Sequence, residues 1–445
     1  PPPPPPPPPF FSHPQPAIPA AQESRGLGDV YKRQIHTLDS IRAYPDYRYL
    51  WTANFCANTA QWLQLLTLGW LVKELTQDGS NSALLVGGVG GAAALPGIII
   101  GPWGGVLGDR LDRKRLVISL ETFMVLLAFS FALLVRTESV LVWHVYAFAL
   151  LAGSCEALKM PVRQALIANT VPSHALSNAY ATSVLTIPGT RMIGPFIGGM
   201  IVAKVGFFWN FTIEAGLYLG VIVALIPMST PYFIRKEFVT KFGISQMVGD
   251  MVDGFKYLWN KQRPLSLIYI LSASPNVVLH PVIFLLPLFT TDVLHRNVDY
   301  GGYMMAINGA GGLLMVFVFS AFGFPKWRGL LCIISALGGA LMTLLLSQSA
   351  WIVSAFVVLA IFGATQTAFR TTNGVLTQTL AEDHYRVRAM SAYRIGMGMV
   401  VFFSLFVGWL AGLISVRPTL VLMGVIGSLI SIGFWIFSPS VRNQE

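Results

Sequence analysis

Ionisable side chains stand inside long apolar stretches of this sequence, at Glu156, Arg191 and Glu214. A charge in such a stretch costs at least about 2.5 kcal/mol on insertion scales unless it meets a partner or water. Arg163 follows Glu156 by seven residues, two helical turns along one face. Glu121 lies nearer the end of its stretch and is not expected to need such a partner. A buried carboxylate beside an arginine is a candidate proton carrier. Burial favours its protonated form, and pairing with the arginine favours its charged form.

The depth of each group follows from its position along its helix. We number the predicted membrane helices in chain order, so that helices four, five and six are 140–160, 177–204 and 207–228. If helix four runs inward from about Val140, Glu156 lies about 24 Å below its outer end. Helix five ends near Val205, which places Arg191 about 21 Å down, and Glu214 lies about 10 Å down helix six. We therefore predict that Glu156 pairs with Arg191 and carries the proton, with Glu214 as the next candidate partner. The pair could be structural or functional.

Other polar side chains stand among leucines and aromatics. Asn54, Asn58 and Gln61 recur at helical spacing and share one face of the first stretch, and His280 stands between two prolines. Polar amides in a membrane helix turn toward a neighbour or a water-filled cavity, so these residues are a candidate cavity lining. The alternatives are interhelical hydrogen bonds for the amides and a bond to a carbonyl for His280, which could otherwise titrate near neutral pH.

A short basic stretch, residues 105–116, separates two apolar segments. Its four cations within six residues cannot lie in hydrocarbon, so it is a tight turn at a membrane surface. The turn resembles the loop between the second and third helices of major facilitator transporters. Asp112, where most of that superfamily has glycine, is common in its drug and siderophore exporter branch. The matching residues are Gly105, Leu107, Asp109, Arg110, Arg113, Lys114 and Leu116.

We expect this turn to act as a conformational latch. Asp109 should approach the N-terminus of helix eleven near residues 389–391, whose dipole favours an anion. Arg113 should pair with a carboxylate near the membrane, either Glu156 or Glu382. Such contacts exist only while that face is closed, so they bias a two-state equilibrium. The alternative is a positive anchor without a further role. The predicted latch residues are Gly105, Asp109, Arg110, Arg113, Lys114 and Glu382.

Helix five carries a glycine- and proline-rich motif, which consists of Gly194, Pro195, Gly198 and Gly199. It resembles the G-P-x-x-G-G part of the antiporter motif, in which Gly and Pro bend the helix and permit close packing. This favours exporters over importers, whereas a kink tolerated in any membrane helix is the plain alternative. Residues 58–64 and 161–172 also resemble the exporter branch. The Glu156 and Arg163 pair resembles the E-x6-R pattern of some sugar-transporting relatives.

The elements that must position these residues are apolar helices. The chain has 445 residues, of which 54% are hydrophobic and 11% charged, whereas soluble proteins carry about 25% charged residues. Runs of about 20 apolar residues can span a bilayer. We predict an all-α integral membrane protein with twelve transmembrane helices in two six-helix pseudo-symmetric halves, the major facilitator fold. The runs are 49–73, 83–107, 116–136, 140–160, 177–204, 207–228, 265–290, 299–323, 329–347, 351–370, 390–414 and 418–437.

The domain organisation follows from these runs. The two halves are 47–228 and 265–437, and 438–445 is a cytoplasmic tail. Residues 229–264 join the halves, and their apolar spacing predicts an amphipathic helix on the inner membrane surface. Residues 1–46 begin with nine prolines and lack a signal-peptide pattern, so we expect a disordered, non-native extension.

The formal net charge of +10 could suggest a nucleic-acid partner, but its distribution argues against one. With both termini inside, about 25 of the 30 Lys and Arg fall on or nearest to cytoplasmic segments. We therefore expect a multi-pass protein of the bacterial inner membrane with cytoplasmic termini. The three cysteines fall in separate helices without metal-ligand spacing, and we expect neither a metal nor a cofactor.

The resemblance implies a secondary transporter with alternating access and a substrate site between the halves near the bilayer midplane. The related branch exports macrolides and enterobactin and includes lysophospholipid flippases. We expect a monomer that exports an amphipathic small molecule of the antibiotic or siderophore class by proton antiport. A flippase or a nutrient importer of the same fold is the alternative. A membrane-embedded enzyme is disfavoured, because the seven histidines are scattered.

Overall fold

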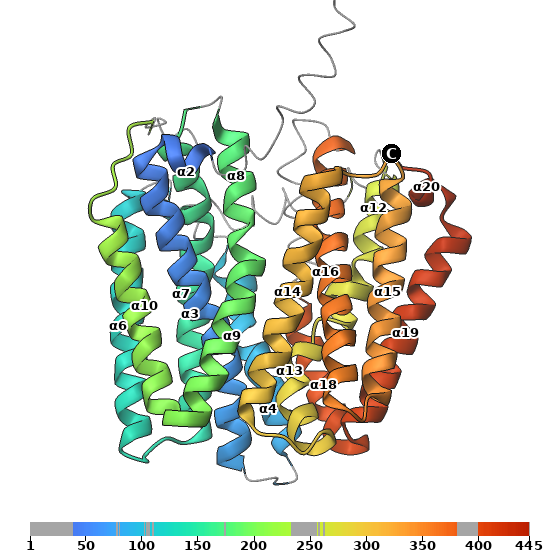
Figure 1. Cartoon of the computed structure of the whole chain (residues 1–445), viewed down its shortest axis with the longest axis horizontal. Helices are drawn as coiled ribbons and strands as arrows, with labels where there is room; N and C mark the ends of the chain where they lie inside the picture. The colour runs from blue at the N-terminus through green and yellow to red at the C-terminus, as the bar shows by residue number, and fades with distance from the viewer. Residues whose placement is uncertain are drawn as a thin grey trace, which may run out of the picture.

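The computed structural model contains helices and loops but no strand in the residues it describes (Figure 1). Nine helices in these ranges are long and apolar enough to cross a membrane, which confirms the all-α membrane fold. The extension before residue 39 and most of the linker, with its predicted amphipathic helix, lie outside the described residues. The described residues are 39–76, 79, 81–101, 103, 107–108, 111–172, 175–232, 256, 259–260, 263–380 and 399–444.

The N-terminal half is a helical bundle. Its helices are α2 (Asp39–Ala43), α3 (Pro45–Thr76), α4 (Ser82–Ile99), α6 (Arg113–Arg136), α7 (Val142–Thr170), α8 (Leu176–Val184), α9 (Thr186–Val205) and α10 (Phe207–Leu225). We name the side on which the chain turns after Arg136 and Val205 the distal side. The opposite side, which holds the described chain ends, is the termini side. Helix α7 runs past its predicted end near 160, because hydropathy detects only the apolar part of a helix.

The C-terminal half has a similar arrangement. Its helices after the first stretch are α14 (Val298–Phe322), α15 (Arg328–Gln348), α16 (Ile352–Leu380), α18 (Val400–Ile414), α19 (Val416–Phe437) and α20 (Pro439–Arg442). Helices α3, α9 and α18 pack beside the nine apolar spans without being among them. The predicted total of twelve spans depends on counting these three as crossings.

The first stretch of the C-terminal half is broken into four elements. These are α12 (Arg263–Leu271), the π-helical η3 (Ala273–Val278), α13 (Val282–Leu288) and the π-helical η4 (Phe289–Val293). Pro275, Pro281 and Pro287 have no amide proton, so regular α-helical hydrogen bonds cannot form there. The run predicted at 265–290 therefore spans the bundle as an interrupted helix.

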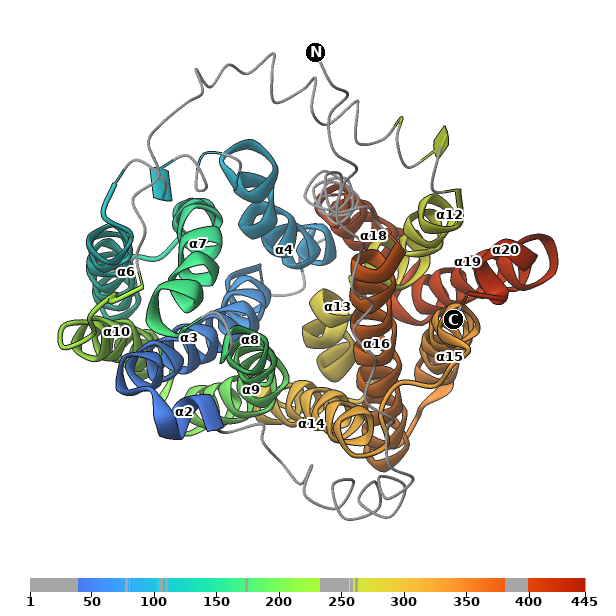
Figure 2. The ribbon, with the colours of Figure 1, turned by 90° about the horizontal axis from the view of Figure 1, so that it is seen from above.

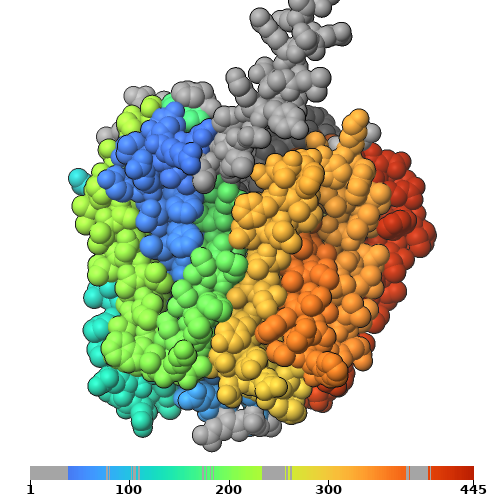
Figure 3. Space-filling model, viewed as in Figure 1, coloured from blue at the N-terminus to red at the C-terminus, as the bar shows by residue number. Residues whose placement is uncertain are grey.

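The halves meet along two seams on opposite sides of the molecule (Figure 2), one of which faces the viewer in Figure 3. Helix α9 packs on α14 in one seam, and α4 packs on α18 in the other. A Cβ atom on Gly302 would lie 2.9 Å from Gly199 Cα, and one on Gly87 would lie 2.7 Å from Gly408 Cα. All four glycines stand within six residues of the distal ends of their helices. The backbones of the two halves therefore come into direct contact in both seams near the distal side.

Toward the termini side, helices pack within their own half. Helix α8 contacts α2, α3, α7 and α9, and α12 contacts η3, α15, α16, α19 and α20. Figure 1 shows the two halves converging toward the distal side. In the described part of the chain, the molecule is thus closed at its distal side.

Candidate functional site

A buried charge network lies inside the N-terminal half. Lys159 Nζ on α7 lies 3.0 Å from Glu121 Oε1 on α6 and 3.3 Å from Glu156 Oε2. Arg163 Nη2 lies 3.0 Å from Glu156 Oε1. Glu156, Lys159 and Arg163 follow one another at intervals of three and four residues, so they share one face of α7.

Glu214 on α10 adds a third carboxylate to this network. Its side chain is fully buried, and it lies within electrostatic range of Lys159. Neither of its oxygens makes a hydrogen bond of ordinary geometry with the described residues. Tyr218, one turn further along α10, places its ring centre 4.9 Å from Lys159 Nζ. The network thus holds three carboxylates and two cations.

The predicted pair of Glu156 with Arg191 is wrong for this structure. Glu156 binds Lys159 and Arg163, which are neighbours on its own helix. Glu214, the second candidate partner for Arg191, belongs to the same network as Glu156. The arginine therefore finds its contacts outside the N-terminal charge network.

Two further charged side chains, Glu121 and Lys159, are buried here against or beyond the sequence-based predictions. Glu121 is fully buried, because α6 begins at Arg113 and the carboxylate lies two turns inside the helix. Lys159 is 1% exposed and bridges two carboxylates. Its spacing from Glu156, three residues along an apolar helix, was the signal that could have identified it.

Arg191 on α9 lies at the junction of the halves. Its Nη2 donates a hydrogen bond of 3.1 Å to Gln366 Oε1 on α16. Its guanidinium carbon lies 5.1 Å from the centre of the Trp62 ring on α3. Arg370 and His280 lie within electrostatic range, and His280 Nδ1 has no hydrogen-bond partner among the described residues. Arg191 therefore connects the two halves.

Asn58 connects the charge network to α9. Its Oδ1 accepts a hydrogen bond of 3.4 Å from Arg163 Nη2, and its Nδ2 donates one of 3.1 Å to Thr186 Oγ1. Asn54 is buried and Gln61 is exposed. Interhelical hydrogen bonding is thus observed for Asn58, and substrate contact by this face stays a prediction.

The helix-five glycines bring α9 close to its neighbours. A Cβ atom on Gly194 would lie 2.8 Å from Thr59 O, and one on Gly198 would lie 3.2 Å from Leu63 Cγ, both on α3. The helix continues through Pro195 without a break. This packing suits export and import equally, so the exporter preference of the motif stays a prediction.

Two cations of the basic turn fasten the start of α6 to the rest of the N-terminal half. Arg113 donates hydrogen bonds of 2.9 Å from Nε to Gly108 O and from Nη1 to Asn169 Oδ1. Lys114 Nζ donates one of 2.8 Å to Ile226 O, just after α10. Cations are usual where helix ends meet a membrane surface.

Only part of the predicted latch lies within the described residues. Glu156, one of the two partners proposed for Arg113, is paired within the buried network instead. The contact of Asp109 with residues 389–391 lies outside the described residues. The latch therefore stays a prediction. Its members outside the described residues are Gly105, Asp109, Arg110 and Glu382.

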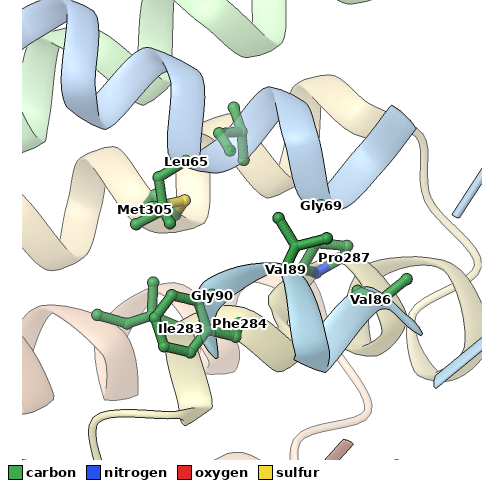
Figure 4. A pocket seen from close by; sticks show the side chains of 10 residues that line it. Leu65, Gly69, Val86, Val89, Gly90, Ile283, Phe284, Pro287 and Met305 are labelled. Carbon is green, nitrogen blue, oxygen red and sulfur yellow. The ribbon is translucent and has the colours of Figure 1, made fainter. Parts of the chain in front are cut away.

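Apolar side chains from both halves pack around a small cavity near the distal side (Figure 4). They leave a cavity of about 10 Å³, which has room for about one water molecule. Gly90 is needed here, because a Cβ atom would lie 2.6 Å from Phe284 ring carbons. We name this group the distal seal. Its residues are Leu65, Leu66, Gly69, Val86, Val89, Gly90, Ile283, Phe284, Pro287 and Met305.

An ion pair joins the halves beyond the distal seal. Lys73 Nζ, near the end of α3, lies 3.0 Å from Asp292 Oδ1 in η4. The Asp292 side chain is 43% exposed, so water screens the attraction. The pair orients the two halves more than it holds them together.

Lys73→Gln is therefore expected to have a small effect on distal closure. Exposed pairs contribute under about 1 kcal/mol, so the opening equilibrium should shift by about fivefold or less. The measurement is the rate at which a distal-side maleimide labels Leu66→Cys in the seal. The exchange Lys73→Asp with Asp292→Lys should return the rate to its starting value. A shift much larger than fivefold would contradict this estimate of the pair.

Comparisons with known proteins agree with this architecture. The sequence family described as transmembrane secretion effector, within the major facilitator superfamily, matches residues 41–442. The chain is 22% identical over 404 residues to the staphyloferrin A transporter of Staphylococcus aureus, which covers 89% of this chain and 97% of that protein. It is 23% identical over 327 residues to the enterobactin exporter EntS of Shigella flexneri, which covers 73% and 75%.

Solved structures support the same fold. A bacterial homologue of the human lysosomal transporter Spinster, in an inward-facing and unoccupied conformation, matches with a TM-score of 0.70 and 14% identity over 89% of this chain and 98% of its own. The inward-open xylose transporter XylE of Escherichia coli matches with a TM-score of 0.68 and 16% identity over 88% and 96%. At these identities the likeness shows the fold alone. The family match and the fold together establish that the chain is a transporter of the transmembrane secretion effector family in the major facilitator superfamily.

Proposed function

We propose that the protein is a secondary exporter of an amphipathic small molecule of the siderophore or antibiotic class, driven by proton antiport. The name of one relative, a staphyloferrin A transporter, and of another, an enterobactin exporter, support this substrate class. We place the protein in a bacterial inner membrane with the termini side in the cytoplasm, an orientation that the distribution of Lys and Arg supports. The distal seal then faces outward, and substrate enters from the cytoplasm.

The observation that carries proton coupling is the excess carboxylate in the buried network. If Glu121, Glu156 and Glu214 were all ionised against Lys159 and Arg163, one net negative charge would remain inside the bundle. An uncompensated buried charge costs several kcal/mol, and one proton removes it. Glu156 has two cationic partners within 3.3 Å, whereas Glu214 forms no ion pair and no hydrogen bond of ordinary geometry with the described residues. We therefore assign the proton to Glu214 in place of Glu156.

Glu214→Gln is expected to abolish gradient-driven efflux while downhill exchange of substrate continues, because a glutamine keeps the network neutral and cannot release a proton. The measurement is efflux in everted vesicles with and without a protonophore, with staphyloferrin A as the first probe. Glu138→Gln is the matched control, since Glu138 is exposed in the distal loop between α6 and α7.

The outcomes separate the parts of the proposal. Wild-type efflux that survives collapse of the gradient would contradict proton coupling. Gradient-dependent efflux retained by Glu214→Gln would contradict only the choice of carrier. Uptake into right-side-out vesicles that exceeds uptake into everted ones would favour the importer considered above.

A further inference from the structure

Arg191 is a buried cation to which the described residues bring no carboxylate. It is 6% exposed, and its single hydrogen bond within the described ranges goes to the neutral amide oxygen of Gln366. The other buried cations there, Lys159 and Arg163, each lie within 3.3 Å of a carboxylate. Within the described residues, Lys159 and Arg163 thus each have a carboxylate partner, whereas Arg191 is hydrogen-bonded to a neutral amide.

Arg191, Gln366 and Trp62 lie at one level in three helices from both halves. Each stands fourteen residues from the distal end of its helix, about 21 Å at the rise of an α-helix. Leu65 and Leu66 of the distal seal follow Trp62 on α3, so the seal lies on the distal side of this level. The arginine is therefore deep within the bundle, on the termini side of the distal seal.

One arginine and one histidine face Arg191 from the C-terminal half. Arg370, one turn beyond Gln366 on α16, and His280, between η3 and α13, both lie within electrostatic range. Helix α14 meets the backbone of α9 at this level, because a Cβ atom on Gly309 would lie 2.7 Å from the carbonyl carbon of Arg191. Helix α3 contributes the neutral Trp62 ring. Arg191 thus faces a second arginine and a histidine across the junction.

Buried guanidinium groups are normally paired, and their planar fork matches a carboxylate with two parallel hydrogen bonds. We propose that Arg191, positioned by Gln366 and the Trp62 ring, binds a carboxylate of the transported molecule, which makes the substrate an organic anion. The apolar residues of the distal seal, Phe284 among them, border this level on its distal side and would contact the apolar body of an amphipathic anion. This inference rests on the proposed transport function and specifies its substrate.

Binding to the purified protein in lipid nanodiscs tests the inference without a gradient. Citrate and salicylate are each compared with a neutral ester, triethyl citrate and methyl salicylate, by the rise in thermal unfolding midpoint as ligand is added. A ligand that binds only the folded state raises this midpoint in a saturable way. At least one anion is expected to do so, with its ester ineffective.

Arg191→Gln is expected to weaken anion binding about tenfold or more, because hydrogen bonds to charged groups are among the strongest in proteins. Arg191→Lys should retain part of the affinity, since it keeps the charge and loses the fork. Arg136→Gln is the matched control: Arg136 lies 5.0 Å from the centre of the Phe208 ring, but at the distal end of α6. If Arg191→Gln does not fold, Gln366→Leu replaces it and should also weaken binding.

The inference is overturned if neither anion binds the wild-type protein, if esters bind as well as anions, or if Arg191→Gln or its replacement binds like the wild type. Equal loss in Arg136→Gln would also overturn it. Anion binding that depends on Arg191, together with efflux that ignores the proton gradient, would contradict the antiport proposal and support this site. Gradient-driven efflux without anion binding would contradict only the site.

Discussion

Lys159→Met is expected to destabilise the folded protein by about 3–5 kcal/mol, the range seen when one partner of a buried ion pair is removed. Lys159 is 1% exposed and stands between Glu121 and Glu156. Without it, the network would keep one cation, Arg163, for the fully buried Glu121 and Glu214 and the partly buried Glu156. The yield of monodisperse protein after detergent extraction and the thermal unfolding midpoint should both fall.

A second substitution should restore much of this loss. Glu121→Gln removes the carboxylate that Lys159 contacts from α6, so the double variant should be more stable than Lys159→Met alone. Lys204→Met is the control, because Lys204 is exposed at the end of α9. An unfolding midpoint for Lys159→Met equal to that of the wild type would show that the network does not hold the bundle together.

Gly302→Ala is expected to hold the halves apart on the distal side. The added Cβ would lie 2.6 Å from Pro195 O and 2.9 Å from Gly199 Cα, and these backbone atoms cannot rotate away. Overpacking costs about 1–3 kcal/mol, which corresponds to a shift of about 5- to 150-fold in the equilibrium between closed and open states. Transport should fall accordingly, because each cycle must close this side.

The shift can be measured by labelling Leu66→Cys with a membrane-impermeant maleimide, after replacing Cys56, Cys155 and Cys332. Gly302→Ala should raise the labelling rate. Gly189→Ala is the matched control on α9, because a Cβ atom there meets nothing within 4 Å. Unchanged labelling in Gly302→Ala, or an equal rise in Gly189→Ala, would contradict the role given to the glycine contact.

Hydropathy predicts the fold well, because a segment in hydrocarbon must be apolar along about 20 residues. It predicts helix ends less well, since backbone hydrogen bonding continues past the apolar region, as α7 does to Thr170. The prolines at 275, 281 and 287 could be read in the sequence. The positions of the π-helical turns could not, because they depend on how that stretch packs against α15, α18 and α19.

The sequence predicts how far along its helix each charged side chain of the candidate site lies, but not toward which neighbour it points. Glu156 and Arg191 do lie equally far from the distal ends of their helices. Depth, however, follows from counting residues, whereas the face that a side chain occupies depends on the rotation of its helix. Arg191 turns toward Gln366, 175 residues away in the sequence. Contacts between the halves are set by tertiary packing, which a local pattern does not reveal.

The interrupted first stretch of the C-terminal half has a mechanical consequence. A regular helix resists bending because each turn is held by backbone hydrogen bonds. Prolines at three positions remove some of these hydrogen bonds from this stretch. At one end α12 is fastened to its own half, and at the other α13 forms part of the distal seal. This stretch is therefore expected to bend more easily than a regular helix, while the contacts at its two ends stay in place. His280 lies within this stretch and within electrostatic range of Arg191, so bending at the prolines would change the distance between these two side chains.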